Sequence, residues 1–218
     1  MKRPRQTVIT PELLEYLEAN FTAEDIFLKE LNEEATVENF PQINITGYQA
    51  NFLQFLVKSI NAKNMLELGT LAGYSAISLI RAAGKNAKLL TVEKNKNHFE
   101  FAKNKIKQAG LAEQIEVINE NAKDFVKNYQ PTEKLDLIFI DADKSEYFNY
   151  LLALSPHLKK GGLFIADNAF AFGFLLDKNN YENPKSMLNF HKHLLSMDEY
   201  RTTLVPIGDG LLVSTKIK

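Results

Sequence analysis

The sequence contains no cysteine and no tryptophan among its 218 residues. Without cysteine the chain cannot form disulfides, thiolate metal sites or cysteine nucleophiles. Long apolar runs are also missing, and the N-terminus begins with basic residues instead of an apolar segment. We therefore expect neither a membrane-spanning helix nor a secretion signal, and we predict a soluble, cytoplasmic protein with no membrane partner.

Charge of one sign is not in excess either. The 26 basic and 27 acidic residues give a formal net charge of −1, so we expect no nucleic-acid partner. Hydrophobic residues make up 45% of the chain, including 15 Phe and 8 Tyr, which is enough for a sizeable core. The length predicts a single domain, 1–218, with an N-terminal helical cap over 1–60 and a ligand-binding core over 61–218.

Apolar periodicity and capping residues predict helices first and a strand–helix alternation afterwards. The first helices are expected over 10–20, 22–35 and 46–60. The alternation indicates a parallel sheet with right-handed crossovers. We predict strands at 65–68, 88–93, 115–118, 136–141 and 163–167. The helices between them are expected at 72–83, 96–109, 122–128 and 145–158. An irregular stretch over 169–183 is then followed by a helix at 184–197. Two final strands, 201–207 and 211–217, flank a glycine-rich turn and should form an antiparallel hairpin.

Two of the predicted strands end on oxygen-bearing side chains. One strand ends at Asp141, and the next ends at Asp167 and is followed by Asn168. Ligands of open α/β sheets bind at the carboxyl ends of the strands, and carboxylate and amide oxygens are the ligands that Mg²⁺ and Ca²⁺ prefer. Lys144 follows Asp141 by three residues. Each acid alone is an ordinary strand-end residue, but together with Lys144 they indicate metal-assisted chemistry.

The turn after the first strand favours a ligand without phosphate. It contains Gly69 and Gly73, but Leu71 stands where a dinucleotide-binding turn has its second glycine. The preceding Glu67 is a poor neighbour for a phosphate. The second strand ends at Glu93, and an acid there can accept hydrogen bonds from both ribose hydroxyls. A ribose without phosphates beside a cationic group describes S-adenosylmethionine better than NAD.

These motifs resemble those of the class I S-adenosylmethionine-dependent, cation-dependent O-methyltransferases, the family of catechol and caffeoyl-CoA O-methyltransferases. The resemblance covers most of the chain, from about residue 41 to residue 212. The matching segments are Leu66-Glu67-Leu68-Gly69-Thr70-x-x-Gly73-Tyr74-Ser75, Val92-Glu93, Ile140-Asp141-Ala142-Asp143-Lys144, Ala166-Asp167-Asn168 and Pro206-Ile207-Gly208-Asp209-Gly210-Leu211. Glu-Leu-Gly marks only the superfamily, whereas Asp-Ala-Asp-Lys followed by Ala-Asp-Asn is far more specific.

The resemblance implies an α/β, Rossmann-like methyltransferase fold: a seven-stranded, mostly parallel sheet with an antiparallel last strand, helices on both faces and extra N-terminal helices. It implies that S-adenosylmethionine is bound by Glu67, Gly69, Gly73, Tyr74, Ser75, Glu93, Ala122 and Asp141. It further implies a divalent cation, Mg²⁺ or another such as Mn²⁺ or Ca²⁺, on Asp141, Asp167 and Asn168, with Lys144 as the catalytic base. A homodimer is also expected from the resemblance.

We therefore predict an S-adenosylmethionine-dependent O-methyltransferase that methylates a hydroxyl of a small, catechol-like aromatic acceptor with vicinal hydroxyls, assisted by a divalent cation. Two alternatives stay open: a metal-independent methyltransferase for another small molecule, and a non-catalytic sensor of S-adenosylmethionine. The segment after Asn168 departs from the family because it lacks the tryptophan common there. Its run Phe170–Leu176 fits either a lid or core packing. Asp143 is expected to face solvent or to lie behind the metal ligands without being one, and the four histidines are expected to be structural or solvated.

Overall fold

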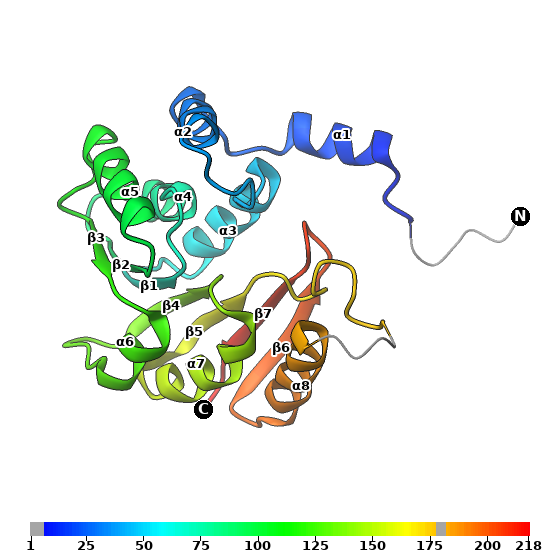
Figure 1. The fold of residues 1–218 in the computed structure, drawn as a ribbon. Coiled ribbons are helices and arrows are strands. Elements are labelled where there is room, and N and C mark those ends of the chain that lie inside the picture. Colours follow the sequence, from blue (N-terminus) through cyan, green and yellow to red (C-terminus); the bar gives the residue numbers. More distant parts are fainter. Residues whose placement is uncertain (1–6, 178–181) are drawn as a thin grey trace, which may run out of the picture.

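The computed structural model describes residues 7–177 and 182–218, and a seven-stranded sheet of order β3-β2-β1-β4-β5-β7-β6 runs through its centre (Figure 1). The strands are β1 Asn64–Leu68, β2 Lys88–Glu93, β3 Ile115–Asn119, β4 Leu135–Ile140, β5 Leu158–Ala166, β6 Tyr200–Val205 and β7 Leu211–Lys216. β7 pairs antiparallel with β5 and with β6, and every other neighbouring pair is parallel. The predicted mostly parallel sheet, its antiparallel last strand and the final hairpin are confirmed.

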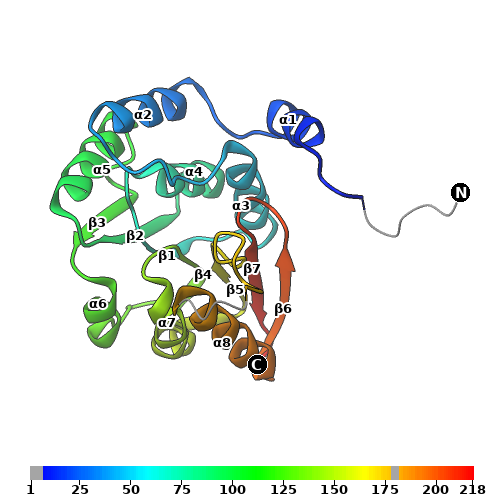
Figure 2. The same cartoon turned by 45° about the vertical axis from the view of Figure 1, so that its right-hand side comes forward.

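Helices cover both faces of the sheet. Successive side chains of a buried strand point to opposite faces, so apolar side chains on each face need a layer of helices to cover them. The helices are α2 Ile26–Val37, α3 Gly47–Ser59, α4 Tyr74–Ala83, α5 Lys96–Gln108, α6 Ala122–Asn128, α7 Tyr147–Leu154 and α8 Glu182–Ser196. In β4, Leu137 and Phe139 pack with α2–α5, whereas Ile138 and Ile140 pack with α6–α8 (Figures 1 and 2). The buried apolar residues therefore form two clusters, one on each face of the same sheet.

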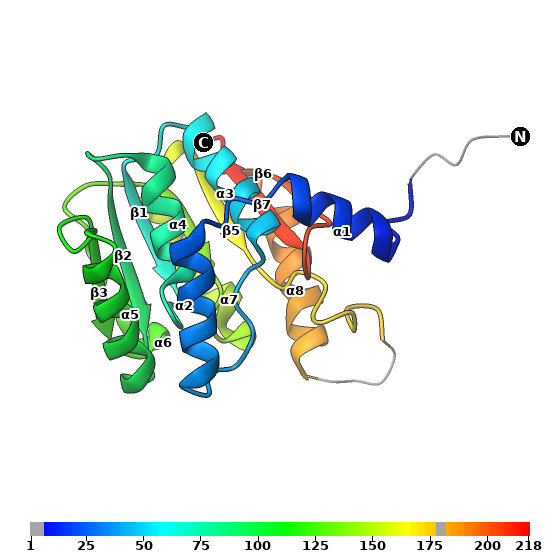
Figure 3. The ribbon, with the colours of Figure 1, turned by 90° about the horizontal axis from the view of Figure 1, so that it is seen from above.

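The first helix, α1 (Pro11–Asn20), projects from the rest of the molecule (Figure 3). Its start is specified locally, because the Thr10 hydroxyl accepts a hydrogen bond from the Leu13 N–H and proline occupies the first turn. None of its residues is buried. Within residues 7–177 and 182–218, no helix has the length and apolar character needed to cross a bilayer.

Two predicted boundaries next to β5 are wrong. The helix predicted over 145–158 is divided into a 3₁₀ turn (Lys144–Glu146), α7 and a second 3₁₀ turn (Ser155–His157) that contains Pro156, which has no N–H to continue an α-helix. The strand predicted to begin at 163 begins at Leu158, and a register irregularity follows its first pairing with β4. The irregular connection predicted over 169–183 is observed up to Asp177, and residues 178–181 lie outside the described part of the chain.

Candidate active site

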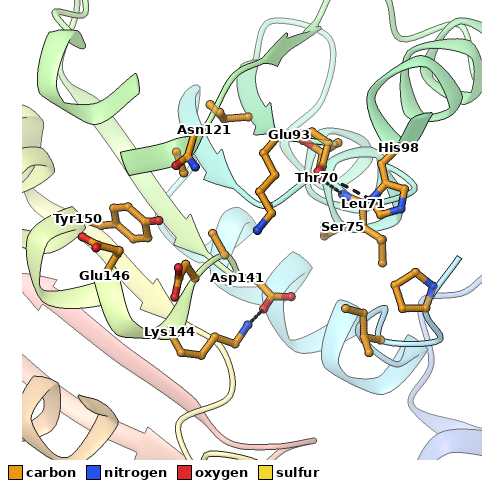
Figure 4. A pocket seen from close by; sticks show the side chains of 18 of the residues that line it. Thr70, Leu71, Ser75, Glu93, His98, Asn121, Asp141, Lys144, Glu146 and Tyr150 are labelled. Atoms are coloured by element: carbon orange, nitrogen blue, oxygen red, sulfur yellow. Dashed lines mark hydrogen bonds and ion pairs between the residues drawn. The ribbon is translucent and has the colours of Figure 1, made fainter. Parts of the chain in front are cut away.

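A cavity of about 560 Å³ opens at the carboxyl ends of β1, β2 and β4. Figure 4 shows Thr70, Leu71, Ser75, Glu93 and His98 on one side of it and Glu146 and Tyr150 on the other, with Asp141 and Lys144 between them. The segment 41–45 before α3 contributes a further wall through Pro41, Ile43, Asn44 and Ile45. The ends of three parallel strands therefore surround one ligand-sized space, as expected for this class of sheet.

The glycine turn after β1 is in direct contact with the end of β4. A Cβ at Gly69 would lie 2.1 Å from the backbone oxygen of Asp141, and the φ of Gly69 is +100°, so only glycine fits here. The Asp141 N–H in turn donates to the Leu68 carbonyl at 2.8 Å. Gly73 also adopts a left-handed conformation and precedes the first residue of α4, which is why that helix begins at Tyr74 and not at residue 72 as predicted.

Beneath this turn, Glu67 is fully buried and bonded by hydroxyl groups. Its two carboxylate oxygens accept hydrogen bonds from the Ser75 hydroxyl at 2.5 Å and from the Thr91 hydroxyl at 2.6 Å. Thr91 and Thr70 also share a hydrogen bond of 2.6 Å. Burial raises the pKa of Glu67 to about 7, although the two hydroxyl donors act in the opposite direction. A buried acid with so high a pKa is a feature that concentrates at functional sites.

Glu93, at the end of β2, is held by backbone donors on both sides of its carboxylate. One oxygen accepts from the Leu71 N–H at 2.9 Å and the other from the Asn95 N–H at 2.8 Å. The residue is only 7% exposed, yet it lines the cavity. Its carboxylate is therefore fixed in orientation and retains lone pairs for hydrogen bonds from a ligand.

The two acidic strand ends lie next to each other. The Asp167 N–H donates to the Ile140 carbonyl at 3.0 Å, so Asp167 follows β5 directly beside the end of β4, where Asp141 lies. Lys144 Nζ is 2.6 Å from Asp141 Oδ1 and forms an ion pair with it (Figure 4). Asn168 has a φ of +55°, and its N–H donates to Asp167 Oδ1 at 2.7 Å.

These residues fit a hard divalent cation. Asp167 is 4% exposed, and its burial, together with the charge of Asp141, raises the pKa of Asp167 to about 7. A carboxylate whose ionisation is disfavoured in this way gains most from a bound cation. In the described residues, no group of three or more His, Cys, Asp or Glu side chains is placed to hold a metal. The candidate set consists instead of two carboxylates and the amide of Asn168, all oxygen donors.

Comparison with known proteins identifies the family. The family model described as O-methyltransferase matches residues 18–217. This chain belongs to the O-methyltransferase family. A catechol O-methyltransferase of Niastella koreensis is 42% identical over 147 residues, which span 65% of this chain and 65% of that protein. Tapetum-specific methyltransferase 1 of Arabidopsis thaliana is 30% identical over 98% of this chain and 97% of its own length.

A solved structure agrees with this assignment. The O-methyltransferase from Bacillus cereus in complex with SAH has a TM-score of 0.86 and 27% identity, and the match covers 93% of this chain and 96% of that chain. The predictions of a Rossmann-like methyltransferase fold and of an S-adenosylmethionine-dependent O-methyltransferase are thus confirmed.

Only some of the predicted site residues of this O-methyltransferase line the cavity. Those that line the cavity are Gly69, Ser75, Glu93, Ala122, Asp141 and Lys144, whereas Glu67, Gly73, Tyr74, Asp167 and Asn168 do not. Tyr74 is 1% exposed, and its hydroxyl donates to Glu24 of the N-terminal region at 3.1 Å. Glu67 is linked to the cavity wall through Ser75 and, by way of Thr91, through Thr70. The roles assigned to all these residues stay predictions.

Several wall residues were not predicted from the sequence, namely Lys94, Asn121, Lys123, Glu146 and Tyr150. Asn121 had a detectable signal, since it follows β3 and its side chain accepts from the Lys123 N–H as the N-cap of α6. His98, expected to be structural or solvated, and Asp143, expected not to be a metal ligand, also line the cavity. The 170–176 run is divided: Phe172 lines the cavity, whereas the Phe170 ring packs against Gly210.

Proposed function

We propose that this O-methyltransferase transfers the methyl group of S-adenosylmethionine to one hydroxyl of a small aromatic acceptor with vicinal hydroxyls, with a divalent cation held by Asp141, Asp167 and Asn168. The main support is the placement of Asp167 beside the end of β4, with Lys144 paired to Asp141 at the cavity. Relatives named catechol O-methyltransferase and caffeoyl-CoA O-methyltransferase support a phenolic acceptor.

The carboxylates of the site support S-adenosylmethionine as the methyl donor, and the lysines Lys94, Lys123 and Lys144 line the same cavity. Glu93, Asp141 and Asp143 line the wall, and Glu67 lies beneath it. These carboxylates suit a ligand that carries a sulfonium and an ammonium group but no phosphate. Glu93 is the residue expected to accept the ribose hydroxyls, because its orientation is set by the N–H groups of Leu71 and Asn95.

The proposed reaction is a displacement at the methyl carbon: the carbon–sulfur bond breaks as the carbon–oxygen bond forms, and the hydroxyl proton leaves. A phenolic hydroxyl has a pKa of about 10 and is mostly protonated at neutral pH, so a base is needed. Lys144, which lines the cavity, is the proposed base. A divalent cation bound at the acidic strand ends would favour the ionised acceptor and fix its orientation.

The decisive experiment measures methyl transfer from labelled S-adenosylmethionine to a panel of catechols, in Mg²⁺ and in EDTA. We expect product that requires Mg²⁺ and is lost in Asp141→Ala. A matched control is Asp124→Ala, which removes a carboxylate of α6 that pairs with Lys127 outside the cavity. Product in EDTA would favour the metal-independent alternative. Tight cofactor binding without any product would favour the sensor.

Lys144→Ala tests the proposed base. Loss of a general base typically slows turnover by about 10²- to 10⁴-fold, and cofactor affinity should stay unchanged. Lys159→Ala is the control, because Lys159 also pairs with an aspartate, Asp136 at 2.7 Å, without lining the cavity. Loss of cofactor binding in Lys144→Ala would assign a structural role to this lysine.

We also propose a homodimer that involves α1. This helix has no buried residue, and the segment around it exposes the apolar side chains Val8, Ile9, Leu14, Tyr16 and Phe21. A second copy of the chain would remove this surface from water. Sedimentation analysis should give a dimer for the full chain and a monomer after removal of residues 1–21. A monomeric full chain would contradict the proposal.

A further inference from the structure

Gln49 connects two parts of the active site that are far apart in the sequence. It lies in the first turn of α3, and its side chain is 5% exposed. The side-chain Oε1 atom of Gln49 accepts a hydrogen bond from the Thr46 backbone N–H at 3.0 Å, and the backbone N–H of Gln49 donates to the Thr46 hydroxyl at 3.2 Å. Its Nε2 atom donates to Asp167 Oδ1 over 3.4 Å. A single amide therefore bonds both the start of α3 and a predicted metal ligand.

The orientation of this amide is set by its partners. The Thr46 N–H can only donate, so the oxygen of Gln49 must face it, and the nitrogen then faces the carboxylate of Asp167. The turn between β6 and β7 packs closely against the amide. A Cβ at Gly208 would lie 2.3–2.5 Å from the amide atoms of Gln49, so this turn contacts Gln49 through glycine.

The same amide is linked to the cavity wall. Thr46 directly follows Ile43, Asn44 and Ile45, which line the cavity. Asn44 is itself held by a hydrogen bond of 2.7 Å to Asn32 of α2. Gln49 therefore connects Asp167 through hydrogen bonds to Thr46, the residue that directly follows segment 43–45 of the cavity wall.

We infer that Gln49 is a positioning residue: it holds Asp167 in the orientation that accepts a divalent cation, and it couples occupancy of that cation to cofactor binding under segment 43–45. The inference rests on the proposed function, because it requires Asp167 to bind the cation. Outer partners of metal-binding carboxylates are typically worth about 10- to 100-fold in metal affinity. Coupling between two sites acts equally in both directions.

The test measures Mn²⁺ affinity of the cofactor-free protein by electron paramagnetic resonance, and cofactor affinity by calorimetry with and without Mn²⁺. Gln49→Met keeps the length of the side chain but removes its donor and acceptor. We expect its Mn²⁺ affinity to fall by about tenfold or more. In the wild type, Mn²⁺ should tighten cofactor binding, and in Gln49→Met this enhancement should shrink towards none.

Two further variants separate this role from helix capping. Thr46→Ala removes the hydroxyl of the cap but leaves the amide of Gln49 beside Asp167, so its Mn²⁺ affinity should stay within about twofold of wild type. Gln54→Met is the matched glutamine control on α3, since the Gln54 amide bonds Ser78 at 2.9 Å and not the site. Its Mn²⁺ affinity should be unchanged.

Each outcome has a distinct meaning. Wild-type Mn²⁺ affinity in Gln49→Met would overturn the inference alone and leave the metal site standing. An equal loss in Thr46→Ala and Gln49→Met would overturn it too, because the helix cap would then be responsible. A wild type that binds no Mn²⁺ would overturn the proposed metal site and this inference with it.

Discussion

Glu67 offers a direct test of the electrostatics of the site. It is fully buried at the carboxyl end of β1, and both of its oxygens accept hydroxyl hydrogen bonds, from Ser75 and Thr91. Burial raises the pKa of Glu67 from an ordinary 4.5 to about 7, because the charged form loses its hydration. We predict that Glu67→Gln stabilises the cofactor-free protein in alkaline solution and weakens cofactor binding.

The sign and size follow from proton linkage. Because the pKa of Glu67 is raised on folding, the folded state holds more protons than the unfolded state between pH 4.5 and about 7. The free energy of unfolding therefore falls as the pH rises through this window and is insensitive to Glu67 outside it. A shift of about 2.5 pH units corresponds to about 3 kcal/mol. An uncharged glutamine does not incur this cost.

The glutamine amide also fits the hydrogen-bond network. Thr91 donates to Glu67 and shares a hydrogen bond with Thr70 in which either hydroxyl can be the donor. When an amide NH₂ replaces the carboxylate oxygen, Thr91 can accept from it and donate to Thr70. Ser75 and Thr91 then both keep a hydrogen bond to residue 67, so most of the gain from removing the charge should be retained.

Urea denaturation of the cofactor-free wild type and Glu67→Gln at pH 5 and pH 8.5 checks this reasoning. The stability difference, variant minus wild type, should grow by about 2–3 kcal/mol between the two pH values. Asp167, whose pKa is also raised by burial, contributes to both proteins and largely cancels. Glu116→Gln, an exposed glutamate on β3, is the control and should show no such growth. A stability difference for Glu67→Gln that is independent of pH would refute the argument.

The same substitution should weaken the binding of S-adenosylmethionine. A carboxylate within about 10 Å of a cationic group contributes more than about 1 kcal/mol at an effective dielectric constant of 20. Calorimetry at pH 8.5, where the wild-type carboxylate is ionised, should therefore show about a tenfold or greater loss of affinity. An unchanged affinity of Glu67→Gln for S-adenosylmethionine would mean that Glu67 serves only to hold the Ser75 hydroxyl in position. The expected combination of higher stability and lower affinity is typical of strained functional groups.

Two further predictions concern the frame of the site. Gly69→Ala should lower the free energy of unfolding by several kcal/mol, because the new Cβ would lie 2.1 Å from the Asp141 backbone oxygen at a φ of +100°. Gly84→Ala is the control and should cost much less, because its Cβ would meet no atom within 4 Å. Urea denaturation of both variants compares the two losses. Tyr200→Phe should lower the free energy of unfolding by about 1 kcal/mol, because the Tyr200 hydroxyl donates to the buried Ser155 hydroxyl at 2.7 Å. Tyr16→Phe, at an exposed tyrosine, is the control and should cause no measurable loss of stability in the same assay.

The strand ends of this fold are predictable from the sequence, whereas some element starts are not. Asp141 and Asp167 end apolar runs, and buried parallel strands end where such runs end. The start of α2 is different, because both Thr22 and Asp25 are suitable caps. Asp25 is the one used. Thr22 instead faces Gly47, where a Cβ would lie 2.0 Å from its hydroxyl oxygen, so a contact with α3 decides the choice.

The start of β5 was likewise set by tertiary structure. Gly161-Gly162 predicts a turn from local preference, and Gly161 does adopt a φ of +82°. Pairing of Leu158 with Leu135 of β4 nevertheless places both glycines inside the strand, at its register irregularity. Local conformational preference was correct for the residue but wrong for the element, because strand pairing outweighs it.

Gln49 shows how a functional residue can have a visible but incomplete signal in the sequence. Thr46 and Gln49 have the spacing of a capping box, so the start of α3 and one partner of the amide can be predicted locally. The second partner, Asp167, lies 118 residues away, and the two meet only because α3 begins near the carboxyl end of β5. The capping oxygen uses only half of the amide, and the other half is free to bond the site. Helix-cap amides at the carboxyl edge of such a sheet are therefore residues in which a local structural role and a functional one can coincide.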